Sequence, residues 1–219
     1  MKNVIFDLDG TLLDTLDDLA VSTNYALHAC GFPARRVEEV RLMVGNGVGK
    51  LIERAVPQGA GEEAVARCLA VFRRHYTDHC LDRTDPYPGI MPMLGALRQR
   101  GIGLAIVSNK LQPAVEELKR RFFASCINVA IGETAQVRRK PAPDMLLQAM
   151  SRLDATAADT VYVGDSDVDI QTAKAAGLPC ISVTWGFRDR QFLEANGATT
   201  LADTPQQIVE LSNCETIKL

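Results

Sequence analysis

Five short apolar runs, rich in β-branched residues, are spaced along the chain and are bounded by turn-forming or polar residues. Runs of this length and composition are typical of buried strands. Between them, apolar residues recur at the three- and four-residue intervals of amphipathic helices. The predicted strands cover residues 4–8, 102–107, 127–131, 160–163 and 180–183, and the predicted helices cover 92–99, 112–122, 144–153 and 167–176.

The alternation of strands and helices is interrupted once. Residues 16–83 show helix patterns only, and this stretch is too long for a single crossover between strands. We therefore predict an inserted all-helical cap, with a hinge in the turn-rich stretch DPYPG at 85–89. The remaining pattern predicts an α/β fold: a Rossmann-like parallel-sheet core at 1–15 and 84–219 with a helical cap at 16–83.

The composition is that of a globular protein with a sizeable core. The 219 residues are 47% hydrophobic and carry a formal net charge of -3, without a Lys/Arg-rich tract. We therefore expect no nucleic-acid partner. No apolar run approaches the roughly 20 residues of a membrane span, and the N-terminus lacks a signal-peptide pattern. We accordingly expect no membrane partner and a cytoplasmic location.

The cysteines and histidines give no clear metal pattern. Six cysteines are scattered without a CxxC pair or regular spacing, which favours reduced thiols over a disulfide framework or a zinc site. His75 and His79 are four residues apart and would share one helix face. Because no third ligand with suitable spacing is evident, we interpret them as a surface pair.

The first predicted strand leads into two aspartates, Asp7 and Asp9, in the stretch VIFDLDGT. If the strand continues to Asp9, both carboxylates lie on one face at its end. Like charges this close disfavour double ionisation unless a positive group lies beside them. The alternative is an ordinary strand and turn, in which Asp9 and Thr11 cap the following helix.

Polar residues also follow the later strands. Ser108 and Asn109 follow the second strand, and Asp165 and Asp169 follow the fourth in the stretch GDSDVD. Lys140 precedes a proline-rich turn and a predicted helix. Ligands of open parallel sheets bind at the carboxyl ends of the strands. We therefore expect these carboxylates, the hydroxyl and the amine to gather at one edge of the sheet.

These four features, in order, are DxDGT, a serine after an apolar strand, a lysine before proline, and GDSxxD. The ordered set resembles the motifs of the haloacid-dehalogenase-like hydrolase superfamily and covers essentially the whole core. The resemblance implies that Asp7 is a nucleophile that forms an aspartyl-phosphate. It implies that Asp9 protonates the leaving oxygen and later activates water. Haloacid dehalogenases lack the second aspartate, so Asp9 points to phosphoryl transfer.

The same resemblance implies a Mg²⁺ site formed by Asp7, the main-chain carbonyl of Asp9, and Asp165, with Asp169 in a supporting role. Ser108 and Lys140 would complete the catalytic set by contacting the phosphoryl oxygens. The residues predicted to bind the substrate's phosphate in the core are Leu8, Gly10, Thr11, Ser108, Asn109 and Lys140.

The glycine-rich stretch VGNGVGK at 44–50 lacks the spacing of a P-loop or of GxGxxG, and no strand precedes it. We interpret it as a cap loop leading into a helix at 51–55. It is similar to the cap loop of phosphoglycolate phosphatases, which implies substrate contacts from Gly47 and Lys50. A solvated lysine is the alternative for Lys50. Trp185, in VTWGFR, is expected to pack near the rim of the site.

Together these features predict a magnesium-dependent phosphatase that acts on a small phosphorylated metabolite, as a monomer or homodimer. The resemblance makes phosphoglycolate the leading candidate. A phosphomutase of the β-phosphoglucomutase type shares all four motifs and remains an alternative. So does an inactive relative that only binds phosphorylated ligands, although intact Asp7 and Asp9 argue against it.

Overall fold

The computed structural model describes residues 1–212. The chain forms two compact units. One contains Met1–Leu13 and the chain from Pro86 onward, and the other contains Asp14–Asp85. The helical cap predicted at 16–83 is two residues shorter at each end than this second unit. We call the two the sheet unit and the helical unit.

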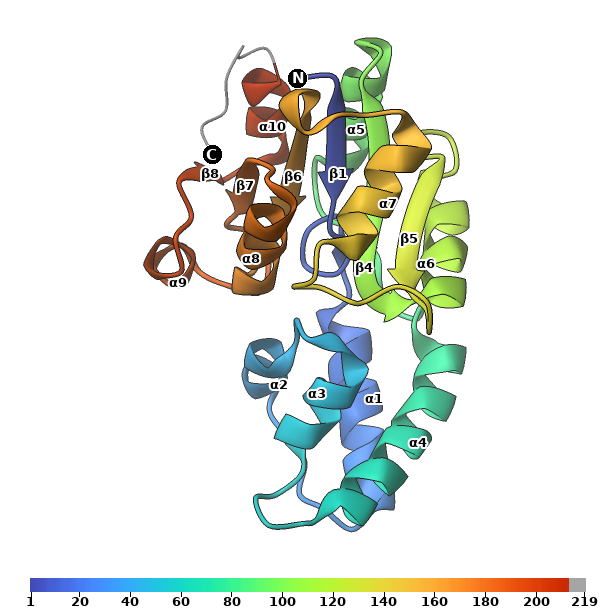
Figure 1. Ribbon diagram of the computed structural model, residues 1–219. Coiled ribbons are helices and arrows are strands. Elements are labelled where there is room, and N and C mark those ends of the chain that lie inside the picture. The colour runs from blue at the N-terminus through green and yellow to red at the C-terminus, as the bar shows by residue number, and fades with distance from the viewer. Residues whose placement is uncertain (213–219) are drawn as a thin grey trace. The chain divides into compact units, whose positions relative to one another are not determined.

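The sheet unit contains a six-stranded sheet in the order β5-β4-β1-β6-β7-β8 (Figure 1). All neighbouring strands are parallel, which confirms the α/β, Rossmann-like fold. Its strands are β1 (Asn3–Phe6), β4 (Gly103–Leu111), β5 (Val129–Glu133), β6 (Thr160–Gly164), β7 (Cys180–Val183) and β8 (Thr200–Ala202). The short edge strand β8 was not predicted.

Strand β1 lies at the point where the strand order reverses. The chain leaves β1, adds β4 and β5 on one side, and then returns to add β6 on the other. Ile5 in β1 pairs with Ala105 in β4 and with Tyr162 in β6, so the three carboxyl ends are in register. This topological switch is where α/β sheets form their ligand sites.

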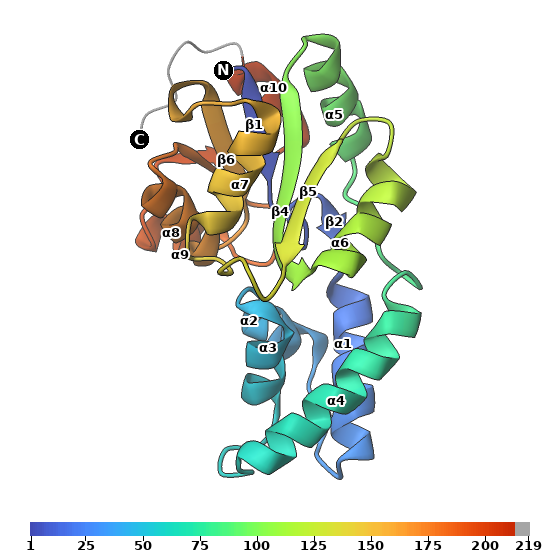
Figure 2. The same cartoon turned by 45° about the vertical axis from the view of Figure 1, so that its right-hand side comes forward.

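Helices cover both faces of the sheet. Helices α7 (Asp144–Leu153) and α8 (Asp167–Ala176) lie in front of it in Figure 1, and both have the predicted bounds. Behind it lie α5 (Ile90–Gln99) and α10 (Pro205–Leu211), and the turned view of Figure 2 shows α7 and α5 on opposite sides of β4. The remaining helical segments of this unit are α6 (Gln112–Leu118), the π-helical turn η1 (Lys119–Phe123), the 3-10 turn η2 (Ala157–Asp159) and α9 (Arg190–Ala195).

The core of the sheet unit lies between the sheet and its helices. On the face covered by α7 and α8, Ile5 and Tyr162 from the strands pack with Met145, Leu146 and Ala173 from the helices. All five side chains are almost completely buried, and each large apolar one stabilises the fold by roughly 1.5–3 kcal/mol. This packing makes the carboxyl ends of β1 and β6 a rigid support for the loops that follow them.

The helical unit contains α1 (Leu16–Ala29), α2 (Val37–Met43), α3 (Gly47–Ala55) and α4 (Glu62–His79). Their apolar faces form one core, which includes Leu27, Ile52 and Phe72. In the described part of the chain, no helix has both the length and the apolar character needed to cross a membrane. The loop predicted at 44–50 is shorter than expected, because α3 begins at Gly47 rather than at residue 51.

The two chain crossings between the units fall in a small two-stranded sheet. It is formed by β2 (Leu13–Asp14) and β3 (Asp85–Pro86), so the predicted hinge at 85–89 begins with paired strand rather than free turn. Within the helical unit, buried Asp18 accepts hydrogen bonds from the main-chain N–H groups of Arg83 and Thr84 and from the Thr84 hydroxyl. These bonds hold the last residues of the unit against its first helix.

No disulfide links the cysteines within residues 1–212. Cys30, Cys68, Cys80, Cys126 and Cys180 are free thiols, while Cys214 lies outside the described residues. Burial and the neighbouring Cys30 raise the pKa of the Cys68 thiol to about 12. Burial and the charge of Asp169 raise that of Cys180 to about 12. Both thiols are therefore protonated and poorly nucleophilic at neutral pH.

Candidate active site

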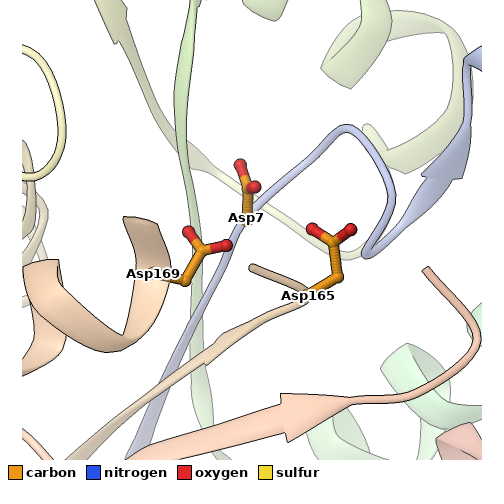
Figure 3. Close-up of side chains that lie close together, drawn as sticks. All are labelled: Asp7, Asp165 and Asp169. Carbon is orange, nitrogen blue, oxygen red and sulfur yellow. The ribbon is translucent and has the colours of Figure 1, made fainter. Parts of the chain in front are cut away.

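Three aspartates gather at the carboxyl ends of β1 and β6 (Figure 3). Asp7 directly follows β1, Asp165 directly follows β6, and Asp169 lies in the first turn of α8. One carboxylate oxygen from each lies within 4.8 Å of the others, and all three residues are buried. In the described chain this is the one cluster of carboxylate, imidazole or thiol groups with the geometry to hold a metal ion.

Lys140 supplies a positive charge inside this cluster. Its Nζ lies 2.8 Å from Asp7 Oδ1 and 2.8 Å from Asp169 Oδ1, and it donates a 3.0 Å hydrogen bond to the Tyr162 hydroxyl. Asn109 holds the main chain of Lys140 at both polar groups: its Oδ1 accepts from the Lys140 N–H, and its Nδ2 donates to the Lys140 carbonyl oxygen. The second and third predicted motifs therefore meet through Asn109.

The charges in this site are poorly balanced. Burial raises the pKa of Asp7 well above its usual range, and repulsion from Asp169 and Asp165 adds to this, although Lys140 opposes it. Burial and the charge of Asp169 raise the pKa of Asp165 to about 7. Burial alone would lower the pKa of Lys140, but Asp169 and Asp7 outweigh it and keep the amine charged. The positive charge of Lys140, and at Asp165 also that of Arg188, offsets these effects only in part, and further positive charge would stabilise the ionised carboxylates.

Asp169 has most of its hydrogen-bonding capacity filled by the protein. Its Oδ1 accepts from Lys140 and from the Tyr162 hydroxyl at 2.8 Å, while its Oδ2 accepts from the main-chain N–H and the hydroxyl of Ser166. A Cβ at Gly164 would lie 2.3 Å from Asp169 Cγ, so only glycine fits beneath it. Asp7 and Asp165 are therefore better placed than Asp169 to offer oxygens to a metal ion.

Asp9 does not join the three-aspartate cluster. Strand β1 ends at Phe6, two residues before the predicted end, so Asp7 and Asp9 do not alternate along a strand as the sequence suggested. Asp9 Oδ1 instead lies 2.9 Å from Nζ of Lys110, and Asp9 Oδ2 lies 3.5 Å from the Ser108 hydroxyl. The two aspartates of the first motif are thus each paired with a different lysine.

The turn after β1 is held from within the protein. The N–H of Leu8 donates to Asp7 Oδ1, the N–H of Gly10 donates to the Leu13 carbonyl, and the N–H of Thr11 donates to the Leu8 carbonyl. To contact a phosphate as predicted, each of these N–H groups would have to give up the protein oxygen to which it now donates, or share its hydrogen bond between that oxygen and the phosphate. Gly10 has φ +84, where a side chain is strained.

The loop after β7, which contains residues 185–187, packs against Asp165 and against the turn that follows β1. The N–H of Phe187 donates to Asp165 Oδ2 at 2.7 Å, and Trp185 Nε1 donates to the Thr11 carbonyl at 3.0 Å. A Cβ at Gly186 would lie 2.4 Å from both Asp165 Cβ and the Gly10 carbonyl oxygen. Trp185 was predicted only to pack near the rim, whereas this loop positions the fourth motif against the first.

Known proteins resemble this chain over almost its whole length. Residues 4–183, a span that contains all four motifs, match the family model described as haloacid dehalogenase-like hydrolase. The chain belongs to this family.

Individual relatives show which members of this family the chain is similar to. The hydrolase is 35% identical to the phosphoglycolate phosphatase of Pseudomonas syringae pv. tomato, over 92% of this chain and 76% of that protein. It is 34% identical to phosphoglycolate phosphatase 1 of Pseudomonas aeruginosa, over 94% and 78% of the two chains. A crystal structure from Lactobacillus delbrueckii subsp. bulgaricus, provisionally named a phosphoglycolate phosphatase, is 37% identical with a TM-score of 0.93, covering 96% and 98%.

The main site residue that the sequence analysis missed in this hydrolase is Lys110. The predicted second strand stopped at Val107, whereas β4 continues to Leu111 and carries Lys110 toward Asp9. The available signal was the position of Lys110 two residues after Ser108, because alternate residues of a strand share a face. A register shift between Val107 and Leu111 marks the irregular end of this strand.

In the helical unit of the hydrolase, the predicted substrate residues Gly47 and Lys50 lie in the first turn of α3. Lys50 Nζ pairs with Glu53 at 2.7 Å, and the two side chains are 46% and 53% exposed. His75 accepts or donates a hydrogen bond with Ser22, and His79 lies 2.7 Å from an Asp82 carboxylate oxygen. The two histidine rings stack on each other rather than converging on a shared point.

Proposed function

We propose that this hydrolase is a magnesium-dependent phosphatase that cleaves a small phosphomonoester through an aspartyl-phosphate on Asp7, with phosphoglycolate as the leading substrate. Membership of the family and the names of the relatives support the reaction class. The observation that carries the mechanism is the buried group formed by Asp7, Asp165, Asp169 and Lys140 at the carboxyl ends of β1 and β6.

The donor set of this group fits Mg²⁺. Asp7 and Asp165 offer hard carboxylate oxygens, which magnesium prefers over nitrogen or sulfur. Burial, and to a smaller extent repulsion between the neighbouring carboxylates, raises the pKa of both groups, so a bound cation would stabilise their ionised forms. The proposed ligands are these two carboxylates and the main-chain carbonyl of Asp9. The ion would offset the repulsion between the nucleophile and the substrate's phosphate. Asp169 supports the site by holding Lys140, to which it is paired at 2.8 Å.

In the proposed reaction, Asp7 attacks phosphorus and the leaving oxygen takes a proton from Asp9. Asp9 then removes a proton from the water that hydrolyses the aspartyl-phosphate, which returns both carboxylates to their starting states. Lys140, 2.8 Å from Asp7 Oδ1, keeps positive charge beside the developing negative charge on the phosphoryl oxygens. Ser108 and Asn109, with the main-chain groups of residues 8–11, complete the proposed phosphate site.

We assign the helical unit the role of a cap that restricts which ester enters. This assignment follows from its all-helical insertion between β1 and β4 and from its resemblance to phosphoglycolate phosphatase caps. The proposed contacts to the substrate's carboxylate come from Gly47 and Lys50. Lys50→Met is expected to raise KM for phosphoglycolate, because the proposed contact to the substrate's carboxylate is lost, and to leave KM for p-nitrophenyl phosphate, which has no carboxylate, unchanged. Because Lys50 pairs with Glu53 at an exposed surface, the substitution should cost little stability.

Hydrolysis of a panel of phosphate esters, with and without Mg²⁺, tests the proposal. The panel contains phosphoglycolate, p-nitrophenyl phosphate and β-glucose 1-phosphate. We expect magnesium-dependent phosphate release, with the highest kcat/KM on phosphoglycolate, and no turnover by Asp7→Asn. Isomerised sugar phosphate in excess of released phosphate would instead identify a phosphomutase, and tight binding without turnover would identify a binding protein.

A further inference from the structure

Lys110 is a lysine in an unusual place. Only 8% of it is exposed, although lysine is among the residues least often buried. Its Nζ lies 2.9 Å from Asp9 Oδ1, and the Asp9 side chain is itself only 17% exposed. Burying an ammonium is costly unless it is paired with an opposite charge. The pairing with Asp9 accounts for how this position tolerates a lysine.

The main chain that carries Lys110 is held tightly. Its N–H donates to the Ser108 hydroxyl at 3.2 Å. On the other side, β5 approaches so closely that a Cβ at Gly132 would lie 2.7 Å from the Lys110 carbonyl oxygen. Lys110 is thus presented to Asp9 from a packed strand end rather than from a mobile loop.

Consecutive residues of this strand end serve different parts of the site. Ser108 and Lys110 both reach Asp9, one at each carboxylate oxygen. Asn109, between them, bonds to the main chain of Lys140. Lys140 in turn pairs with Asp7 and Asp169, so the two buried lysines are assigned to different carboxylates.

We propose that Lys110 is a positioning residue that fixes the Asp9 carboxyl group for proton transfer: the proton passes from the Asp9 carboxyl to the leaving oxygen, and the carboxylate left on Asp9 is the ionised form that pairs with the Lys110 ammonium. Asp9 lies in a turn beyond the end of β1, where its side chain lacks the support of a regular strand. The ion pair holds Oδ1 and leaves Oδ2 on the side of Ser108, which belongs to the proposed phosphate site. This role rests on the proposed phosphatase function, in which Asp9 is the general acid and base.

A positioning role through Asp9 has a specific kinetic consequence. Esters with poor leaving groups, such as phosphoglycolate, need a proton on the leaving oxygen, whereas p-nitrophenolate leaves with little help. Displacing Asp9 should therefore lower kcat/KM for the first kind of ester and largely spare kcat/KM for the second, because kcat/KM reports the steps up to formation of the aspartyl-phosphate. Hydrolysis of the aspartyl-phosphate, which also uses Asp9, is common to both esters and affects kcat. A lysine that contacted the phosphoryl group directly would affect both esters alike, because the phosphoryl group is common to them.

The test compares kcat/KM for phosphoglycolate and p-nitrophenyl phosphate in wild type, Lys110→Met and Lys110→Arg, with exposed Lys174→Met as the matched control. We expect Lys110→Met to lose about 10- to 100-fold on phosphoglycolate, a part of the roughly 100- to 10,000-fold that a well-placed proton donor contributes, and less than about threefold on p-nitrophenyl phosphate. Lys110→Arg should recover much of the difference, and Lys174→Met should match wild type.

The ratio of the two constants is measured on one protein sample, so partial unfolding of a variant cancels. Equal losses on both esters would overturn the positioning role and assign Lys110 to the phosphoryl group. A changed melting temperature with an unchanged ratio would also overturn it and make Lys110 purely structural. If wild type hydrolyses neither ester with Mg²⁺, the proposed function itself fails, a result distinct from a flat ratio in an active enzyme.

Discussion

Asp165→Asn is expected to stabilise the metal-free protein at neutral pH. The Asp165 carboxylate is buried, and burial together with the charge of Asp169 raises its pKa from 3.8 to about 7. Asparagine removes the charge with little change of shape and keeps an oxygen that can accept the 2.7 Å hydrogen bond from the Phe187 N–H. The substitution therefore removes the electrostatic cost and preserves the main contact.

The sign and size follow from the pKa of Asp165 in the two states. Because the pKa is higher in the folded protein, the folded state binds more protons than the unfolded state between pH 3.8 and about 7. The free energy of unfolding of wild type should thus fall as pH rises through this window. At ~1.4 kcal/mol per pKa unit, the full change is roughly 4 kcal/mol. Asp165→Asn should lack this slope.

Urea unfolding followed by circular dichroism, at pH 5 and pH 7.5, measures the effect. In chelator, wild type should lose stability between the two pH values, while Asp165→Asn should lose much less. Mg²⁺ at 100 times its Kd should restore about 2.7 kcal/mol to wild type and little to the variant. Asp167→Asn, at the partly exposed first residue of α8, should behave as wild type.

Two results would refute this reasoning about the charge balance. One is a pH slope in Asp165→Asn equal to that of wild type, which would mean that Asp165 is not the group that titrates. The other is equal stabilisation of both proteins by Mg²⁺, which would exclude Asp165 as an important ligand.

Three further substitutions test separate parts of the account. Asp9→Asn should be nearly inactive on phosphoglycolate but should keep Mg²⁺ affinity in calorimetry, because its proposed ligand atom is the main-chain carbonyl; loss of metal binding would contradict this. Asp18→Ala should lower the free energy of unfolding by about 1–3 kcal/mol, since the Thr84 N–H and hydroxyl lose their buried acceptor; an unchanged urea midpoint would disprove it. Gly10→Ala should weaken Mg²⁺ binding, because its Cβ would lie 2.4 Å from Asp165 Oδ2; wild-type affinity would count against that contact.

The regular part of the fold could be predicted from the sequence because local patterns determine it. The strand at 180–183 and the helices at 144–153 and 167–176 have the bounds that their apolar spacing indicates. The helix predicted at 112–122 ends early, since residues 119–123 form a π-helical turn that buries Phe123 instead of Phe122. Strand β8 has only three residues at a sheet edge, too few to give a pattern.

The site was predictable as a set of residues but not as a set of pairs. The motifs identified Asp7, Asp165 and Lys140, and strand topology brings them together because parallel strands end at one edge. Which cation meets which carboxylate depends on where a strand ends and on side-chain direction. The continuation of β4 beyond Val107 decides that Lys110 reaches Asp9, and no spacing rule applied to the first motif could show it.

Rapid acid quench of the enzyme during turnover, followed by peptide mass spectrometry, tests the central claim most directly. The account predicts a phosphoryl group on the peptide that contains Asp7, sensitive to hydroxylamine as an acyl phosphate should be, and absent from Asp7→Asn. Steady turnover of phosphoglycolate with no phosphoryl group on that peptide, or with the group on another residue, would contradict the assignment of Asp7 as the nucleophile.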